Sequence, residues 1–230
     1  MKKSKNKYLG WELESFDNAN NFRNYQFSII KKFIKGKIAE VGPGNGSILK
    51  LYYKKSKSIY VFEPSRNLFD NLKKIFKKQN KIKLINDEFN LKKNYYDTII
   101  YLDVLEHIKN DKIELIKAYK SLKPNGHLII NVPAFQHLYS QFDRDVKHFR
   151  RYNKSEIIKI TKNLNIVQLK YYDSIGYLLS LSSKIFASNY KKQFTKKIII
   201  WDSLIFLSKI LDKILFNSFG KSLIIVIKKN

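Results

Sequence analysis

Three glycines at alternate positions, Gly42, Gly44 and Gly46, follow the acidic residue Glu40 at the end of a short apolar segment. Because glycine lacks a Cβ, the backbone can turn tightly here and a ligand can lie directly against it. At the carboxyl end of a first α/β strand, the expected ligand is a nucleotide-type molecule. A dinucleotide-binding loop has its third glycine one position later, where this chain has Ser47. The spacing therefore indicates a nucleotide-type ligand other than a dinucleotide, or a turn without a ligand.

Two later strand ends carry further polar residues. Residues 58–62 form a β-branched and aromatic run that predicts a short buried strand, and Glu63 follows it directly. A carboxylate at this place can accept hydrogen bonds from ribose hydroxyls; a solvated surface position is the alternative. Residues 96–102 predict a central parallel strand, followed by Asp103 and His107. From there His107 can face a reacting group, or it can cap a helix or bind the backbone.

The glycine loop, the D-x-L-E-H pattern at residues 103–107 and the L-K-P-x-G turn at residues 122–126 resemble motifs of the class I S-adenosylmethionine-dependent methyltransferases. The similarity covers residues 30–173 and implies S-adenosylmethionine as the cofactor. Glu40 would help to hold its methionine end, Glu63 its ribose and Asp87 its adenine amino group. A turn-forming role is the alternative for Asp87. The implied cofactor-binding set is Glu40, Gly42, Gly44, Gly46, Glu63, Asp87 and Asp103.

The loop at residues 133–152 contains three arginines and two histidines. It resembles a stretch found in methyltransferases of bacterial cell-surface glycan clusters. Arg150 and Arg151 can pair with a phosphate or carboxylate of an acceptor, with Tyr152 beside them. His148 can take a proton from a hydroxyl or amine, because the unperturbed pKa of histidine lies near neutrality. The alternative is that His148 and Arg151 tie the loop to nearby acidic side chains.

The elements that position these residues predict a single domain over residues 1–230. Residues 1–36 are expected to form a helical lead-in over the cofactor cleft. Short apolar strands then alternate with amphipathic helices, which predicts parallel strands with right-handed crossovers. The fold class is therefore α/β, with a Rossmann-like, doubly wound sheet of seven strands. The last strand is expected to be antiparallel, and residues 174–219 form a helical insertion before it.

The insertion contains an almost entirely apolar run at residues 198–216, which predicts a helix that must be covered. Asp202, Lys209, Asp212 and Lys213 argue against a transmembrane span. Three interpretations remain: a cap over the acceptor pocket, a homodimer interface or an interfacial membrane helix.

Composition narrows the partners. The formal net charge is +26, but the positive residues are mostly lysines and are scattered along the chain. Nucleic-acid recognition favours arginine. Compositional drift, meaning a general enrichment in lysine without selection for binding, therefore explains the charge better than nucleic-acid binding does. The chain lacks cysteine, which excludes thiolate chemistry, and its histidines lack close metal-ligand spacing, so we expect no metal. No apolar signal core follows the charged N-terminus, which predicts a cytoplasmic protein. The resemblance to methyltransferases of glycan clusters implies that it is bacterial, and the interfacial-helix interpretation of residues 174–219 would place it at the inner face of the membrane.

Together these features predict an S-adenosylmethionine-dependent methyltransferase that acts on oxygen or nitrogen of a small, glycan-linked or lipid-linked acceptor. His107 and His148 are the catalytic candidates. Two alternatives stay open: an RNA-modifying methyltransferase, and a non-catalytic cofactor-binding protein that recruits a partner.

Overall fold

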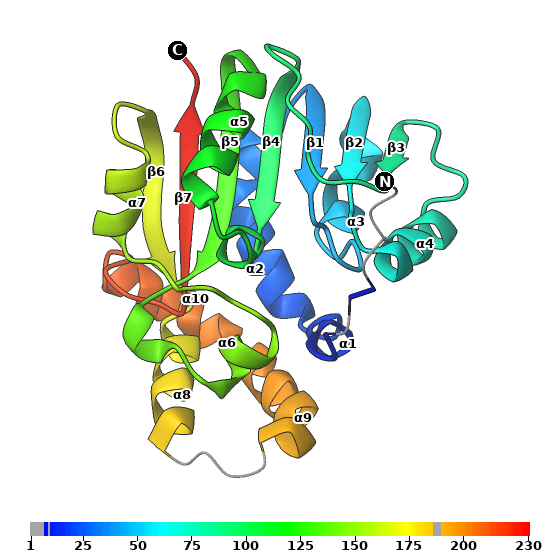
Figure 1. The fold of residues 1–230 in the computed structure, drawn as a ribbon. Coiled ribbons are helices and arrows are strands. Elements are labelled where there is room, and N and C mark those ends of the chain that lie inside the picture. Colours follow the sequence, from blue (N-terminus) through cyan, green and yellow to red (C-terminus); the bar gives the residue numbers. More distant parts are fainter. Residues whose placement is uncertain (1–6, 9, 186–189) are drawn as a thin grey trace.

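The centre of the molecule is one seven-stranded sheet with the order β3-β2-β1-β4-β5-β7-β6 (Figure 1). The computed structural model describes residues 7, 8, 10–185 and 190–230. Its strands are β1 (Lys37–Val41), β2 (Ser58–Phe62), β3 (Ile82–Ile85), β4 (Tyr96–Leu102), β5 (Leu122–Pro133), β6 (Asn165–Tyr172) and β7 (Ser222–Lys228). Strands β1 to β5 are parallel, and β7 pairs antiparallel with both β5 and β6. The predicted doubly wound sheet with an antiparallel last strand is confirmed.

Helices cover both faces of this sheet (Figure 1). Ile99 and Tyr101 of β4 enter the hydrophobic core on one face, whereas Ile100 enters the core on the other face. Since side chains alternate along a strand, burial on both faces requires the continuous apolar run seen in this segment. The helices are α1 (Glu12–Phe16), α2 (Asn20–Ile30), α3 (Leu49–Tyr52), α4 (Arg66–Ile75), α5 (Asp111–Ser121), α6 (Gln141–Asp145), α7 (Lys154–Ile160), α8 (Ser174–Ile185), α9 (Tyr190–Ser203) and α10 (Ile205–Ile214).

The predicted helical insertion at residues 174–219 is present as α8, α9 and α10, which extend from the carboxyl edge of the parallel strands (Figure 1). The expectation of one continuous helix over residues 198–216 is wrong. The chain breaks at Leu204, so α9 and α10 are separate helices.

Two acidic residues of the apolar run fasten the insertion to the rest of the protein. Asp202 is buried and accepts hydrogen bonds from the backbone N–H groups of Asn21 (3.1 Å) and Phe22 (2.8 Å) at the start of α2. Asp212 is buried and accepts from the backbone N–H of Ser174 (3.0 Å) at the start of α8. Each carboxylate therefore satisfies the free N–H groups of another helix and complements its positive end.

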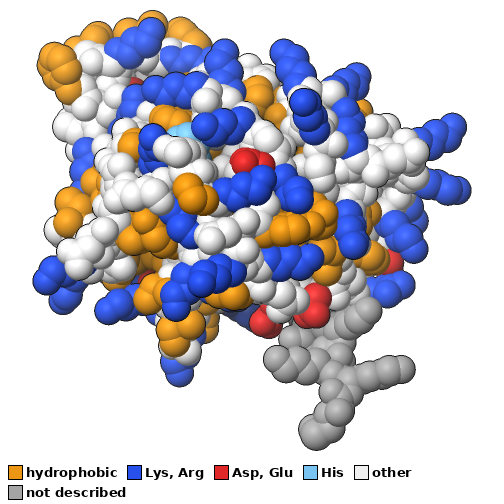
Figure 2. Space-filling view, turned by 90° about the horizontal axis from the view of Figure 1, so that it is seen from above, with side chains coloured by type: hydrophobic (Ala, Val, Ile, Leu, Met, Phe, Trp, Pro, Cys, Tyr) orange, Lys and Arg blue, Asp and Glu red, His pale blue; other side chains and the backbone are white. Residues whose placement is uncertain are grey.

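Positive side chains are spread over the face at the top of Figure 1, among neutral and apolar ones, with few acidic residues (Figure 2). This face lies opposite the carboxyl edge from which the insertion extends. Over the described residues, every helix is too short or too polar to cross a bilayer.

Candidate active site

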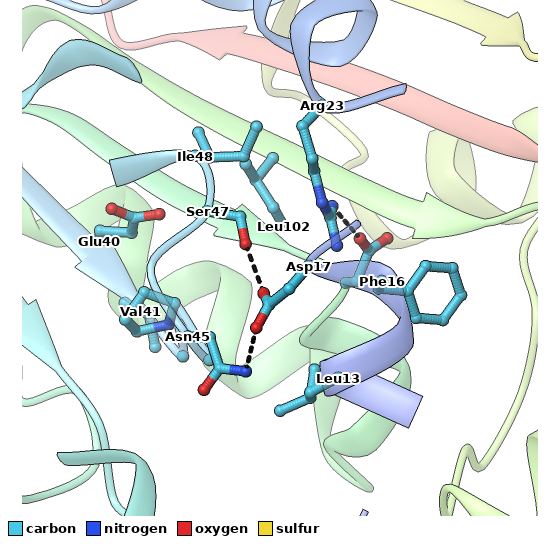
Figure 3. A pocket seen from close by; sticks show the side chains of 14 residues that line it. Leu13, Phe16, Asp17, Arg23, Glu40, Val41, Asn45, Ser47, Ile48 and Leu102 are labelled. Atoms are coloured by element: carbon cyan, nitrogen blue, oxygen red, sulfur yellow. Dashed lines mark hydrogen bonds and ion pairs between the residues drawn. The ribbon is translucent and has the colours of Figure 1, made fainter. Parts of the chain in front are cut away.

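A cavity of about 80 Å³ lies at the carboxyl ends of β1 and β4, between the glycine loop and helices α1 and α2 (Figure 3). A wider hollow of about 360 Å³ adjoins it and shares Leu13, Asp17 and Asn45 with it. Glu40, Gly42, Gly44 and Asp103, all predicted from the sequence, line the smaller cavity.

The glycine loop has the backbone that its sequence requires. Gly42 and Gly44 have φ values of +61° and +59°, in the region that L side chains rarely adopt. A Cβ at Gly42 would lie 2.9 Å from Val104 Cγ2, and a Cβ at Gly44 would face only Leu13, at 3.6 Å. Glycine at position 44 therefore leaves a cradle between the loop and α1 that a ligand can fill.

Glu40 and Arg23 place opposite charges on two walls of the cavity (Figure 3). Burial raises the pKa of Glu40 to about 7, against the hydrogen bond from Tyr52 Oη (2.6 Å) and the charge of Arg23, which both lower it. The Nε of Arg23 is buried and has no hydrogen-bond partner among the described residues. A carboxylate facing a guanidinium suits the ammonium and carboxylate groups of an amino acid. Sequence reasoning missed Arg23, although arginine is scarce in this chain.

A closed ring of hydrogen bonds holds this wall of the cavity. Arg23 Nη1 donates to Gln26 Oε1 (3.0 Å), Gln26 Nε2 donates to Tyr172 Oη (3.0 Å), and Tyr172 Oη donates to Asn131 Oδ1 (2.9 Å). Asn131 Nδ2 then donates to Asp103 Oδ1 (2.6 Å), whose other oxygen accepts from Arg23 Nη1 (3.4 Å). Asp103 has a φ of +58°, so the ring also holds a strained backbone in place. The ring joins α2, β4, β5 and β6.

The other predicted cofactor residues lie outside the smaller cavity. Glu63 is buried at the tip of β2, and its Oε1 accepts from the Ser65 backbone N–H (2.9 Å). Burial raises the pKa of Glu63 to about 7, although hydrogen bonds from Ser65 and from the Gly44 backbone N–H partly oppose this. Asp87 is exposed and accepts from the Glu88 backbone N–H (2.9 Å), as in the turn-forming alternative. Gly46 lies against Leu72, 3.0 Å from where its Cβ would be.

Helix α1 is fastened to the glycine loop through one carboxylate. Asp17 accepts hydrogen bonds from Asn45 Nδ2 (2.7 Å) and Ser47 Oγ (2.9 Å) (Figure 3). Leu13 and Phe16 of α1 line the cavity beside it. The helical lead-in, where the structure describes it, therefore covers this cavity, but the fastening by Asp17 was not predicted.

The loop after β5 is organised around the buried residue Asp143. Its Oδ1 lies 2.8 Å from His148 Nδ1, and Arg151 donates to both oxygens through Nε and Nη2, at 2.9 Å each. Burial alone would raise the pKa of Asp143, but the hydrogen bonds from His148 and Arg151 outweigh it and hold that pKa well below its usual range. Arg151 is 5% exposed, and its guanidinium is bound to Asp143. It therefore ties the loop together, which is the second of the two roles considered for this residue.

Arg150 and Tyr152 both bind Asp111 at the start of α5. Arg150 Nη1 lies 2.5 Å from Asp111 Oδ2, and Tyr152 Oη donates to the same oxygen at 2.9 Å. Tyr152 is buried, whereas the Arg150 side chain is partly exposed. Of the three predicted acceptor-binding residues, Arg150 thus keeps the most contact with solvent.

The two catalytic candidates lie side by side. The rings of His107 and His148 are 4.6 Å apart between centroids, and His148 Nε2 lies 3.8 Å from Glu106 Oε1. Burial and, to a smaller extent, the nearby charge of His148 lower the pKa of His107 to about 4.

Residues 16–168, more than half of the chain, match the family model described as a methyltransferase domain. The chain belongs to this methyltransferase family. It is an S-adenosylmethionine-dependent enzyme. A comparison with curated proteins finds no significant match.

Solved structures of low sequence identity share the fold of this methyltransferase. A candidate methyltransferase of Bacillus halodurans has a TM-score of 0.63 at 12% identity, over 89% of this chain and 97% of the other. The N-methyltransferase NodS of Bradyrhizobium japonicum, in complex with S-adenosylhomocysteine, has a TM-score of 0.60 at 14% identity, over 95% and 91%. Phosphoethanolamine N-methyltransferase 2 of Haemonchus contortus, in complex with phosphomonomethylethanolamine and S-adenosylhomocysteine, has a TM-score of 0.62 at 16% identity, over 96% and 58%.

The cavity of the methyltransferase fits the methionine end of this cofactor. Glu40 would hold the ammonium group, and the unpartnered Nε of Arg23 is available to the carboxylate. When bound, S-adenosylmethionine supplies a methyl group that is already activated by its positive sulfur, so the protein contributes mainly positioning and charge complementarity.

Proposed function

We propose that this methyltransferase acts on an oxygen or nitrogen of a small acceptor that carries a sugar, phosphate or lipid group, at the inner face of a bacterial membrane. The observation that carries the proposal is the two-sided insertion. One side of α9 packs on aromatic residues between the cofactor cavity and His148, and the outward side of α10 is apolar.

The inner side of α9 contributes to an aromatic cluster. Phe194 packs edge-to-face on Trp11 (4.6 Å between centroids) and Phe16 (5.6 Å), and it stacks on Phe142 (5.4 Å). Phe16 lines the cofactor cavity, and Phe142 contacts the ring of His148 (6.2 Å). The cluster therefore spans from the cofactor cavity to the catalytic candidate, which supports the interpretation of the insertion as a cap over the acceptor.

The outer side of α10 exposes three large apolar side chains. Phe206, Ile210 and Ile214 are 57%, 53% and 63% exposed and follow each other at intervals of four residues, so they form one line on the helix. Lys209 and Lys213 lie beside this line. Apolar side chains flanked by lysines suit the surface of an anionic membrane, where the former enter the acyl boundary and the latter meet head groups.

The acceptor side has features that suit an anionic group. Arg150 is partly exposed, and the nematode neighbour was crystallised with a phosphate ester. His148 is oriented by the Asp143 carboxylate through Nδ1, which leaves Nε2 for the acceptor side. His107 and His148 are accordingly the groups we propose to act on the acceptor.

The membrane part is tested by sedimentation with vesicles that contain either anionic or only zwitterionic lipids. We expect binding to the anionic vesicles, and loss of binding in the triple variant Phe206→Ser, Ile210→Ser, Ile214→Ser. The matched control is Ile113→Ser, Ile116→Ser, which removes exposed apolar side chains from α5. If the wild type ignores vesicles and instead forms a dimer that the triple variant dissociates, the membrane part is wrong and the surface is a dimer interface.

The acceptor part is tested by incubating the enzyme with labelled S-adenosylmethionine and separate lipid, sugar and RNA fractions of a bacterial extract. Label in the lipid or sugar fraction is expected. Label confined to RNA would overturn the acceptor class in favour of the RNA-modifying alternative.

A further inference from the structure

Three potential metal ligands meet on the acceptor side of the site. One ligand atom from each of Glu106, His107 and His148 lies within 4.8 Å of the other two. We propose that these three side chains bind a divalent transition-metal cation, with an open coordination position for an oxygen of the acceptor. The second part of this inference rests on the proposed function; the cation site itself does not.

Each imidazole is already held by an acceptor outside the cluster. His148 Nδ1 lies 2.8 Å from the Asp143 carboxylate, and the His107 ring hydrogen-bonds the backbone of Lys147. Such contacts fix the tautomer and orientation of metal-binding histidines and leave the other nitrogen free to bind the ion. His148 Nε2 indeed faces Glu106 Oε1, at 3.8 Å.

Glu106 supplies an independent observation. The residue is 1% exposed, and its Oε2 has no hydrogen-bond partner among the described residues. A buried carboxylate oxygen without a donor is costly. Asp103 and Asp143 lie close enough to add negative charge around Glu106, and Arg151 opposes them only partly. A cation between Glu106 and the two imidazoles would provide the missing partner.

The ligand set and the geometry indicate which cation fits. Two imidazoles and one carboxylate suit Zn²⁺, Co²⁺, Fe²⁺ or Mn²⁺, whereas Mg²⁺ and Ca²⁺ prefer oxygen ligands alone. Bonds of about 2.0–2.2 Å place neighbouring ligand atoms roughly 3–3.5 Å apart. The distance of 3.8 Å between His148 Nε2 and Glu106 Oε1 is close to this range, and the remaining separations, all within 4.8 Å, would have to shorten by rotation of the side chains when an ion binds.

Three protein ligands leave at least one coordination position for an exogenous oxygen. The three ligands lie beside the aromatic cluster of Phe194, because Phe142 of that cluster contacts the His148 ring. A hydroxyl bound at that position would lose its proton to solvent more readily, because the cation stabilises the oxyanion. The histidines would then serve as ligands instead of proton acceptors. Spacing along the chain could not reveal the cluster, since His148 follows β5 whereas Glu106 and His107 follow β4.

The cation site is tested by titrating chelator-treated protein with Zn²⁺ in a calorimeter and with Co²⁺ in an absorption spectrometer. We expect one ion per chain, with Co²⁺ bands typical of nitrogen and oxygen ligands. The double variant His107→Gln, His148→Gln should bind the ions at least 100-fold more weakly, while His137→Gln serves as the matched control and retains wild-type affinity. Affinity for S-adenosylhomocysteine, measured on the same samples, should be unchanged in all three proteins.

Absence of stoichiometric ion binding to the wild type, or unchanged binding in the double variant, would overturn the site. If the double variant fails to fold, Glu106→Gln decides in its place, with a loss of at least tenfold expected. The open position is tested with azide, which should shift the Co²⁺ bands of the loaded wild type. An unshifted spectrum would overturn the open position. If the wild type itself did not bind S-adenosylhomocysteine, the result would instead count against the proposed function.

Discussion

The buried carboxylate of Glu40 should make the enzyme without its cofactor less stable as the pH rises, and Glu40→Gln should remove this effect. Burial raises the pKa of Glu40 from 4.5 to about 7. Between these pH values the unfolded chain releases the proton while the folded chain keeps it, so rising pH favours the unfolded state. The contribution of protonated Glu40 to the free energy of unfolding is fully present below pH 4.5 and is lost as the pH rises to 7.

The magnitude follows from the two pKa values. Their difference corresponds to roughly 3 kcal/mol of unfolding free energy, and at about 2–4 °C per kcal/mol for a chain of this size the Tm effect is about 6–12 °C. Glutamine has the same shape and can still accept the hydrogen bond from Tyr52 Oη, but it does not titrate. The Tm of Glu40→Gln relative to wild type should therefore rise by about this amount between pH 5 and pH 8.

Differential scanning calorimetry without ligand measures this difference, with Glu88→Gln, an exposed position, as the control whose relative Tm stays constant. The same variant should bind S-adenosylmethionine more weakly at pH 8, because a charged partner for the ammonium group is lost. A Tm difference between Glu40→Gln and wild type that does not change with pH would refute the reasoning, since it would mean that the folded protein does not hold Glu40 protonated.

Four further outcomes are expected. Arg23→Met should weaken S-adenosylhomocysteine binding by about 1.5–3 kcal/mol through loss of a charged hydrogen bond, and calorimetry that finds unchanged affinity would remove Arg23 from the cofactor site. Tyr172→Phe opens the hydrogen-bonded ring and should cost about 1–2 kcal/mol in urea unfolding and also weaken cofactor binding; a loss of stability with full cofactor affinity would show that the ring does not position Arg23 and Asp103. Arg151→Ala deprives the buried Asp143 of two charged hydrogen bonds and should destabilise the enzyme by about 3–5 kcal/mol, whereas Arg144→Ala on the exposed side of the same loop should change the urea midpoint little. Random RNA should bind weakly and be released steeply by salt in filter-binding assays, and selective, salt-resistant RNA binding would contradict the assignment of the charge to compositional drift.

The sheet and the glycine loop could be predicted because their signals are local. A continuous apolar run in the sequence predicts strand β4. The alternate glycines Gly42 and Gly44 predict a tight turn, because glycine adopts left-handed backbone easily. The ring that joins Arg23, Tyr172 and Asp103 could not be predicted, since its members come from α2, β6 and the end of β4. Contacts between side chains so distant in sequence depend on the complete fold.

The same reason explains the loop after β5. Its sequence offered Arg151 equally as an acceptor ligand or as a structural tie, because either role needs the same residue type. Only the position of Asp143, buried beneath the guanidinium, decides which partner the arginine has taken. In α9 and α10, the acidic residues Asp202 and Asp212 interrupt a hydrophobic pattern. They do so because each accepts hydrogen bonds from the first backbone N–H groups of another helix, which the local sequence cannot reveal.

The place of β7 has a consequence for the order in which the protein can form. This strand lies between β5 and β6, although it follows both of them in the sequence. While the ribosome still holds residues 222–228, β6 has no neighbour in the sheet. The helices of the insertion are therefore synthesised before β7, the strand that joins β6 to β5. The five parallel strands can assemble during synthesis, whereas β6 and the insertion that follows it must wait for β7. Pairing over so long a stretch of chain is slow, so β6 and the insertion should be the last regions of the enzyme to become resistant to proteases during refolding.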